Sequence, residues 1–157
     1  MDVVRCLLVL SIFAGSVIAF GQSESAPVLP DGAGKETFVS VCSLCHAPTA
    51  PMGKQWTRAE WELKVTEMLQ EEPDVTREER AVIVEYLAAN FRPGGKIYIN
   101  KAGAKDLVTA LEISPAEADA IVRVRKAQGD FKSLDDLKKV SPLDVSKVEG
   151  KKERLVF

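Results

Sequence analysis

Two thiols and the single imidazole of the 157-residue chain lie within five consecutive residues, Cys42-Ser43-Leu44-Cys45-His46. Cysteines three positions apart, followed directly by histidine, form the C-x-x-C-H motif that is typical of covalent haem attachment. The two thiols can reach the two vinyl groups of one porphyrin, and the adjacent imidazole can then serve as an axial ligand of the iron. A single histidine excludes bis-histidine haem and His-rich zinc sites. We therefore expect one haem c, attached through Cys42 and Cys45, with His46 as the proximal ligand.

Three other kinds of site use similar residues. A disulfide between Cys42 and Cys45 would suit an oxidising compartment, but it leaves His46 without a role. A thioredoxin-like redox pair is expected beside a βαβ pattern, which this sequence lacks. A structural zinc site needs more ligands than two thiols and one imidazole. Haem attachment is the interpretation that uses all three side chains.

Residues 1–21 have the features of a secretory signal. Arg5 precedes an apolar stretch at residues 7–18, and the small residues Ala19 and Gly21 mark a cleavage site. An uncleaved membrane anchor is the alternative, although the apolar stretch is shorter than the about 20 residues that span a bilayer. Because haem c is attached outside the cytoplasm, the motif and the signal together predict a periplasmic protein.

Two breaks divide the remaining chain. Residues 22–33 are rich in Ser, Pro and Gly and are expected to form a linker, and a second linker is expected at residues 93–96. The formal net charge of −2 excludes a generally basic nucleic-acid coat, and 46% apolar residues fit a folded protein. We expect an all-α fold with two small helical domains, at residues 34–92 and 97–157.

Residues 34–92 resemble the short single-haem modules of the cytochrome c class I superfamily. Gly34 and Phe38 match the glycine and the aromatic residue that face the last helix in that family. Residues 76–90 supply this last helix, with Tyr86-Leu87 as its closing aromatic–aliphatic pair. The resemblance implies a small helical haem domain that exchanges single electrons with a redox partner protein.

The helix expected at residues 76–90 has a defined start. Thr76 is a candidate N-cap, and Glu79 three positions later completes a capping box. Val82, Ile83 and Tyr86 begin an apolar stripe at helical spacing. This stripe predicts which face of the helix packs against the rest of the domain.

The sixth ligand of the iron is expected to be a thioether, since the chain offers no second histidine. Met68 lies 22 residues after His46 and before the last helix, where the resemblance places the distal methionine. Met52 lies six residues after His46, across a proline-rich stretch, and is the second candidate. An open coordination position is the third possibility. Trp61 is expected at the haem edge, because few aromatic residues are present to cover a porphyrin.

Residues 97–157 resemble the double helix-hairpin-helix domain of competence-type DNA receptors. Ile97, Asn100 and Ala102 match the I-x-x-N-x-A start of that family, and residues 129–137 match its G-x-F-x-S-x-x-D-L link. The resemblance implies two helix pairs, each built around a tight hairpin.

The hairpins themselves depart from that family, in which each reads P-G-I-G and its backbone N–H groups approach a phosphate. Here residues 111–114 and 141–144 carry none of the four glycines. Glu112 and Asp144 instead place carboxylates near the expected phosphate position, and Pro142 removes a donor. Two modest basic strips are present: Arg123, Arg125 and Lys126, and Lys138, Lys139, Lys151 and Lys152. We expect these lysines and arginines to lie on solvated helix faces.

No Ser-His-Asp set and no glycine-rich phosphate loop occurs in the sequence, so we expect an electron-transfer protein rather than an enzyme. The prediction is an exported monohaem c-type cytochrome, whose C-terminal module docks it to a redox partner. The alternative is an extracellular DNA-binding protein that uses residues 97–157, with the haem in a structural or sensory role.

Overall fold

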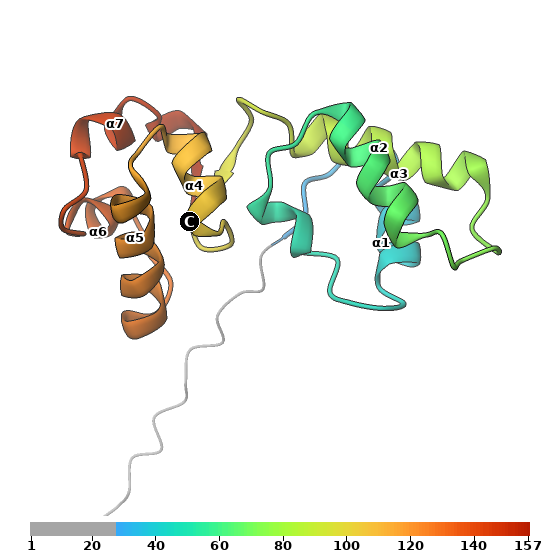
Figure 1. Cartoon of the computed structure of the whole chain (residues 1–157), viewed down its shortest axis with the longest axis horizontal. Helices are drawn as coiled ribbons and strands as arrows, with labels where there is room; N and C mark the ends of the chain where they lie inside the picture. The colour runs from blue at the N-terminus through green and yellow to red at the C-terminus, as the bar shows by residue number, and fades with distance from the viewer. Residues whose placement is uncertain (1–27) are drawn as a thin grey trace, which may run out of the picture.

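The computed structural model describes residues 28–157, as two groups of helices that lie side by side (Figure 1). The signal predicted at residues 1–21 lies outside the described residues, as does the linker up to residue 27. Within residues 28–157, none of the helices combines the length and the apolar character needed to cross a membrane. The mostly helical fold expected from the sequence is confirmed.

The N-terminal part, residues 28–92, contains three α-helices and one 3-10 turn. These are α1 (Lys35–Cys42), η1 (Ala50–Gly53), α2 (Arg58–Met68) and α3 (Arg77–Asn90). The capping box expected at Thr76 is present: its hydroxyl accepts from the backbone N–H of Glu79 at 3.1 Å, and the Glu79 carboxylate accepts from the Thr76 N–H at 2.9 Å. Thr57 and Glu60 form a second capping box at the start of α2.

Helix α1 and the residue before it pack against α3 through Gly34 and Phe38, the two residues expected to make this contact. Gly34, at a φ of 87°, lies so close to α3 that a Cβ atom there would be 2.9 Å from the Val82 side chain and 3.0 Å from the Val82 carbonyl oxygen. The ring of Phe38 stacks on that of Tyr86, with 5.1 Å between centroids. The expected contact of Gly34 and Phe38 with the last helix is therefore confirmed.

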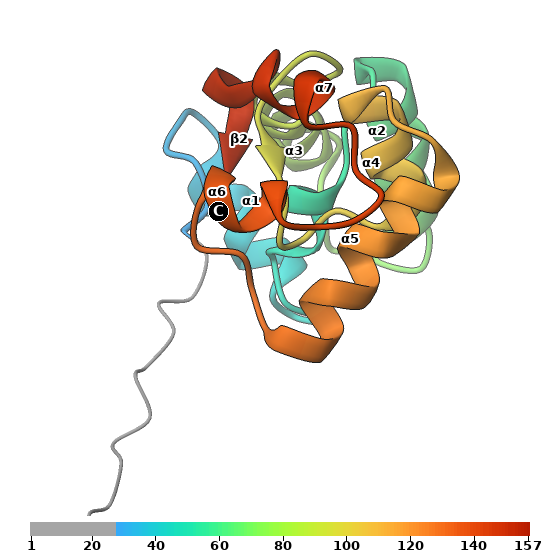
Figure 2. The same cartoon turned by 90° about the vertical axis from the view of Figure 1, so that its left-hand side faces the viewer.

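The C-terminal part, residues 93–157, contains four α-helices around its own apolar core. Its elements are β1 (Ile97–Tyr98), α4 (Ala104–Leu111), α5 (Pro115–Gln128), α6 (Leu134–Lys138), α7 (Val145–Glu149), η2 (Lys152–Arg154) and β2 (Leu155–Val156). Helices α4 and α5 pack against each other, and the shorter α6 and α7 follow them and are joined by the ion pair of Lys138 with Glu149 at 2.7 Å (labelled in Figure 2). Leu107, Ile121 and Leu137 are fully buried between them.

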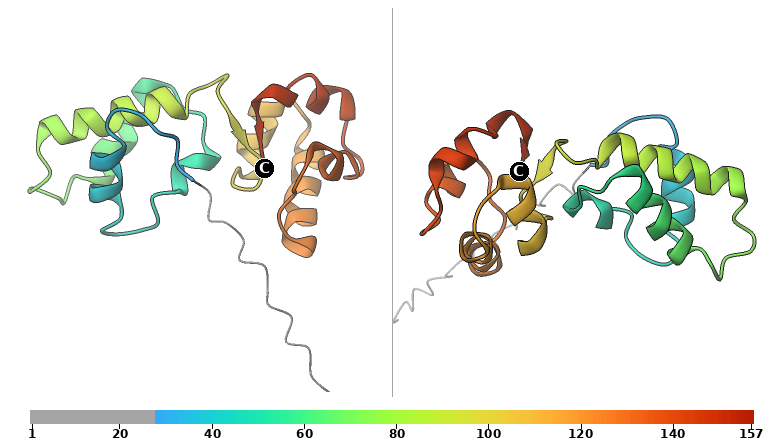
Figure 3. Two further views of the ribbon diagram at one scale, coloured as in Figure 1. Left: turned by 180° about the vertical axis from the view of Figure 1, so that it is seen from behind. Right: turned by 45° about the horizontal axis from the view of Figure 1, so that its top comes forward.

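One feature of this part differs from the all-α expectation: β1 and β2 pair in parallel, Ile97 with Leu155 and Tyr98 with Val156. The C-terminus consequently lies between the two groups of helices (Figure 3). Tyr98 belongs to the core of the N-terminal part, where its ring lies 6.0 Å from that of Phe91. A short non-local pairing of this kind leaves no periodic signal in so few residues.

The segment expected as a linker at residues 93–96 is held by side chains from both parts of the chain. The Gln55 amide donates to the carbonyl oxygens of Gly95 and Lys96, at 3.2 and 2.7 Å. Arg154 donates to the same Gly95 oxygen at 2.9 Å. Nearby, Lys54 pairs with Asp106 at 2.9 Å, which joins η1 to α4.

Candidate functional site

An open apolar cavity of about 170 Å³ lies between the end of α1, the following turn, and helices α2 and α3. Its wall contains Cys42, Cys45 and His46 from the motif and Met68 from the last residue of α2. The remaining lining residues are mainly apolar: Val41, Leu44, Val65, Leu69, Glu72, Val75 and Ile83. The structure therefore brings four of the five predicted site residues to one cavity.

The motif follows directly from the geometry of α1. Cys42 is the last residue of this helix, and the chain continues in turns, with the N–H of His46 donating to the Cys42 carbonyl oxygen at 3.4 Å. Both cysteines are free thiols, Cys42 half-buried and Cys45 exposed. The local backbone thus brings two thiols and one imidazole to the wall of the same cavity.

The imidazole of His46 is oriented by its own main chain. Its Nδ1 lies 3.1 Å from the Ala47 carbonyl oxygen. Because a carbonyl oxygen only accepts hydrogen bonds, this contact places a proton on Nδ1, and in the neutral ring the lone pair is then on Nε2. Metal-bound histidines commonly have this arrangement, with one ring nitrogen held by a carbonyl group.

The two thiols differ in their environment. Burial raises the pKa of the Cys42 thiol to about 11, and the neighbouring Cys45 adds to the increase. Cys42 is therefore a neutral thiol at neutral pH rather than a reactive thiolate, which does not suit thioredoxin-type exchange chemistry. A neutral, half-buried thiol beside an exposed one is compatible with attachment to a hydrophobic group.

The two methionines of the described chain have different surroundings. Met68 is 41% exposed and lines the cavity, whereas Met52 is 2% exposed and packs in the core of the N-terminal part. Among the residues of the cavity wall, Met68 supplies the thioether. The geometry therefore favours Met68 over Met52 as a partner for a group held by the motif.

Trp61, which the sequence analysis placed at the haem edge, is not among the residues that line the cavity. It is 2% exposed, and its indole N–H donates to the Phe91 carbonyl oxygen at 3.1 Å. The ring also packs on Trp56, with 4.6 Å between centroids. The structure thus gives Trp61 a packing role, and its contact with a haem stays a prediction.

The side chains in the cavity wall are of the types that attach and ligate haem c. They include two thiols, one imidazole with a free Nε2, and one thioether. Within residues 28–157, no three His, Cys, Asp or Glu side chains come together as a protein-only metal site. The cavity is smaller than the roughly 300–1,000 Å³ pockets that enclose a ligand. A porphyrin held here would therefore extend beyond this cavity.

In the C-terminal part, the first hairpin has a strained non-glycine residue, Glu112, where the family that it resembles has glycine. Glu112 lies between α4 and α5 with a φ of 58°, in the left-handed region that favours glycine. Its carboxylate pairs with Lys151 at 2.7 Å. The backbone thus has the conformation of a glycine hairpin, while its surface carries an acidic side chain.

A second carboxylate, that of Glu117, accepts hydrogen bonds from backbone N–H groups of both hairpins. It was not among the residues expected from the sequence. Glu117 is only 8% exposed, and it accepts from the N–H groups of Ser114 at 2.7 Å and Asp144 at 2.6 Å. The hydrogen bond with the Ser114 side chain, followed by these two backbone bonds, lowers the pKa of Glu117 to about 2. The Ser114-x-x-Glu117 capping box was visible in the sequence, but the bond from Asp144 depends on the tertiary fold. These two N–H groups are therefore already used within the chain.

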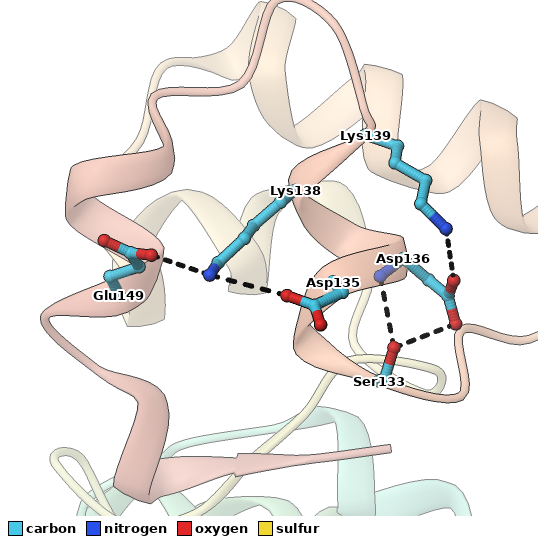
Figure 4. Close-up of polar contacts among 6 residues, drawn as sticks. All are labelled: Ser133, Asp135, Asp136, Lys138, Lys139 and Glu149. Carbon is cyan, nitrogen blue, oxygen red and sulfur yellow. Dashed lines mark hydrogen bonds and ion pairs between the residues drawn. The ribbon is translucent and has the colours of Figure 1, made fainter.

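Most of the basic strip that was expected near α6 and α7 is paired with acids. Lys138 contacts Asp135 at 3.5 Å and Glu149 at 2.7 Å, and Lys139 contacts Asp136 at 2.9 Å (Figure 4). On α5, the half-buried guanidinium of Arg125 donates to the Ile99 and Ala102 carbonyl oxygens, at 2.6 and 3.0 Å. Lys151 is held by Glu112, as described above. Four of the seven basic residues singled out in the sequence thus have intramolecular partners.

Comparison with known proteins gives one match, to the family model described as helix-hairpin-helix motif, over residues 93–155. This stretch of the chain is a helix-hairpin-helix domain. Such a domain is compatible with nucleic-acid binding. The match does not extend into residues 28–92, and no cytochrome family matches them. No curated protein and no solved structure matched the chain.

Proposed function

We propose that the chain carries one covalently attached haem c in the cavity and transfers single electrons outside the cytoplasm. The observation that supports this proposal is the shared cavity of Cys42, Cys45 and His46, from the end of α1, with Met68 from the end of α2. Met68 is separated from the motif in sequence, so its position there is a result of folding. The comparisons support the helix-hairpin-helix domain alone.

Several residues of the cavity have a defined task in this proposal. Haem supplies the one-electron couple when it is bound. Cys42 and Cys45 would hold it through thioether bonds, and His46, whose Nδ1 contacts the Ala47 carbonyl oxygen, would supply Nε2 as a ligand. Val65 and Ile83 exclude water from the inner wall, since both are buried. The exposed rim at Leu44 and Cys45 leaves an edge through which an electron can pass.

The experiment is expression of the exported chain with a haem c maturation system, followed by a haem stain and an absorption spectrum. We expect one haem per chain, lost in Cys42→Ala, Cys45→Ala and His46→Ala. Ser43→Ala, inside the same motif, is the control and is expected to keep its haem. An exported protein that has two free thiols and no haem would exclude the proposal.

The distal ligand is tested separately on the same loaded protein. Met68→Ala is expected to lose the charge-transfer band of a Met-ligated ferric haem and to bind carbon monoxide in the reduced state. Leu63→Ala is the matched control, because Leu63 lies exposed on the same helix outside the cavity wall. Carbon monoxide binding by the unmodified reduced protein would favour an open coordination position instead.

A second candidate function is nucleic-acid binding by residues 93–155, which the family match favours. Of the seven basic residues in the two strips, Arg123, Lys126 and Lys152 remain for such binding, because the other four have partners within residues 28–157. A mobility shift of duplex DNA with the full chain at two salt concentrations tests this function. Retention that falls steeply with salt and is lost when all three are changed to Gln would support DNA binding. Without such retention, the domain is better explained as a docking element for a redox partner protein.

A further inference from the structure

The segment between α2 and α3 forms one wall of the candidate haem cavity. Leu69, Glu72 and Val75 from this segment line the cavity together with Met68, which directly precedes it. Its backbone is weakly bonded within itself, with the Glu72 N–H donating to the Leu69 oxygen at 3.2 Å and the Val75 N–H to the Glu72 oxygen at 3.3 Å. The position of this wall therefore depends on contacts from outside the segment.

Arg80 supplies such contacts from the second turn of α3. Its Nη2 donates to the Glu72 carbonyl oxygen at 2.7 Å, and its Nε donates to the Val75 carbonyl oxygen at 3.1 Å. Both acceptors belong to residues of the cavity wall. A guanidinium offers these two donors in one rigid plane, whereas a lysine ammonium offers a single point of attachment on a flexible chain.

We propose that Arg80 is a positioning residue that clamps the α2–α3 segment and so holds Met68 toward the group bound in the cavity. This inference rests on the proposed function, since it concerns the distal side of the haem. Met68 is the last residue of α2, and Leu69 caps that helix, so displacement of the segment would move the thioether. Without the clamp, the sixth position of the iron would open to solvent and small ligands for part of the time.

Two variants test the role of Arg80. Arg80→Gln removes both the charge and the paired Nε and Nη2 donors, whereas Arg80→Lys keeps the charge but not the paired donors. Arg77→Gln is the matched control: Arg77 lies on the same helix, and within residues 28–157 no hydrogen bond or ion pair involves its side chain. In the loaded protein, we expect Arg80→Gln to weaken the methionine charge-transfer band and to bind carbon monoxide about tenfold faster. Arg80→Lys is expected to show most of this effect, and Arg77→Gln none.

A second measurement does not require haem. In the unloaded protein, amide exchange at Glu72 and Val75 is expected to become about tenfold faster in Arg80→Gln and Arg80→Lys, with exchange in the α3 core unchanged. Unchanged exchange together with an unchanged carbon monoxide rate would overturn the inference. If the wild-type chain attaches no haem, the proposed function and the role of Arg80 toward Met68 both fail, whereas faster exchange in the variants would still show the clamp on the segment.

Discussion

Gly53 lies directly against the backbone of Lys101: a Cβ atom at position 53 would be 2.6 Å from the Lys101 carbonyl oxygen. The contact joins η1 of the N-terminal part to the turn after β1. Neither partner is a flexible side-chain end, so the close approach requires the absence of a side chain at Gly53. The two parts of the chain therefore meet backbone to backbone at this point.

Gly53→Ala is expected to lower the free energy of unfolding by about 1–3 kcal/mol, because the added methyl group must push η1 away from Lys101. Urea denaturation followed by circular dichroism measures the change. Gly32→Ala is the control, because a Cβ atom at Gly32 would meet only the Asn90 amide, at an ordinary 3.7 Å. Equal stability of the two variants would contradict the close contact.

Tyr98→Ala is expected to uncouple the two parts of the chain. The Tyr98 side chain comes from β1 but is buried in the core that contains Phe91, so its loss leaves a cavity between the parts. We expect a destabilisation of about 3 kcal/mol. Both tryptophans lie in the N-terminal part, so their fluorescence can be compared with circular dichroism of the whole chain. The two transitions should coincide in the wild type and separate in the variant.

Trp61→Phe separates the packing role of Trp61 from a role at the haem edge. The substitution keeps an aromatic ring but removes the indole donor to the Phe91 carbonyl oxygen, which still accepts from the Trp56 backbone N–H at 3.0 Å. We therefore expect the loss of a single hydrogen bond, about 0.5–1.5 kcal/mol. Trp56→Phe, on the neighbouring ring, is the control and should cost less. A changed haem spectrum in a Trp61→Phe protein that keeps the wild-type stability would instead support the position of Trp61 at the haem edge.

Glu117 predicts a specific dependence of stability on pH. Its pKa falls from an ordinary 4.5 to about 2 in the folded chain, chiefly because Ser114 and Asp144 donate hydrogen bonds to the carboxylate. A lowered pKa stabilises the fold above the unfolded-state value, and this stabilisation is lost as the pH falls from about 4.5 toward 2. Glu117→Gln should therefore be less stable than the wild type at pH 7, and the difference should shrink over that interval. A difference independent of pH would contradict the ionised state of Glu117.

The two thiols are expected to react at different rates with iodoacetamide in the reduced, haem-free protein. The pKa of Cys42 is raised to about 11 by burial and by Cys45, so only a small fraction is thiolate at pH 8. Cys45 is exposed and should be modified first. Mass spectrometry of the peptides after short reaction times identifies the site. Faster modification of Cys42 would contradict its buried, neutral state.

Local sequence determined those features that depend on neighbouring residues. The C-x-x-C-H spacing places Cys42, Cys45 and His46 on consecutive turns because the chain between them is too short to separate them. The capping box of Thr76 and Glu79 likewise involves a single helical turn, so the start of α3 was predictable to the residue.

Tertiary structure alone decided the features that join distant segments. It placed Met68 in the cavity and Met52 in the core, gave Trp61 a backbone acceptor, and brought the Asp144 N–H to Glu117. The parallel pairing of β1 with β2 belongs to the same class. No periodicity of one segment specifies which other segment it meets, because that choice is set by how the apolar faces of all the helices are buried together.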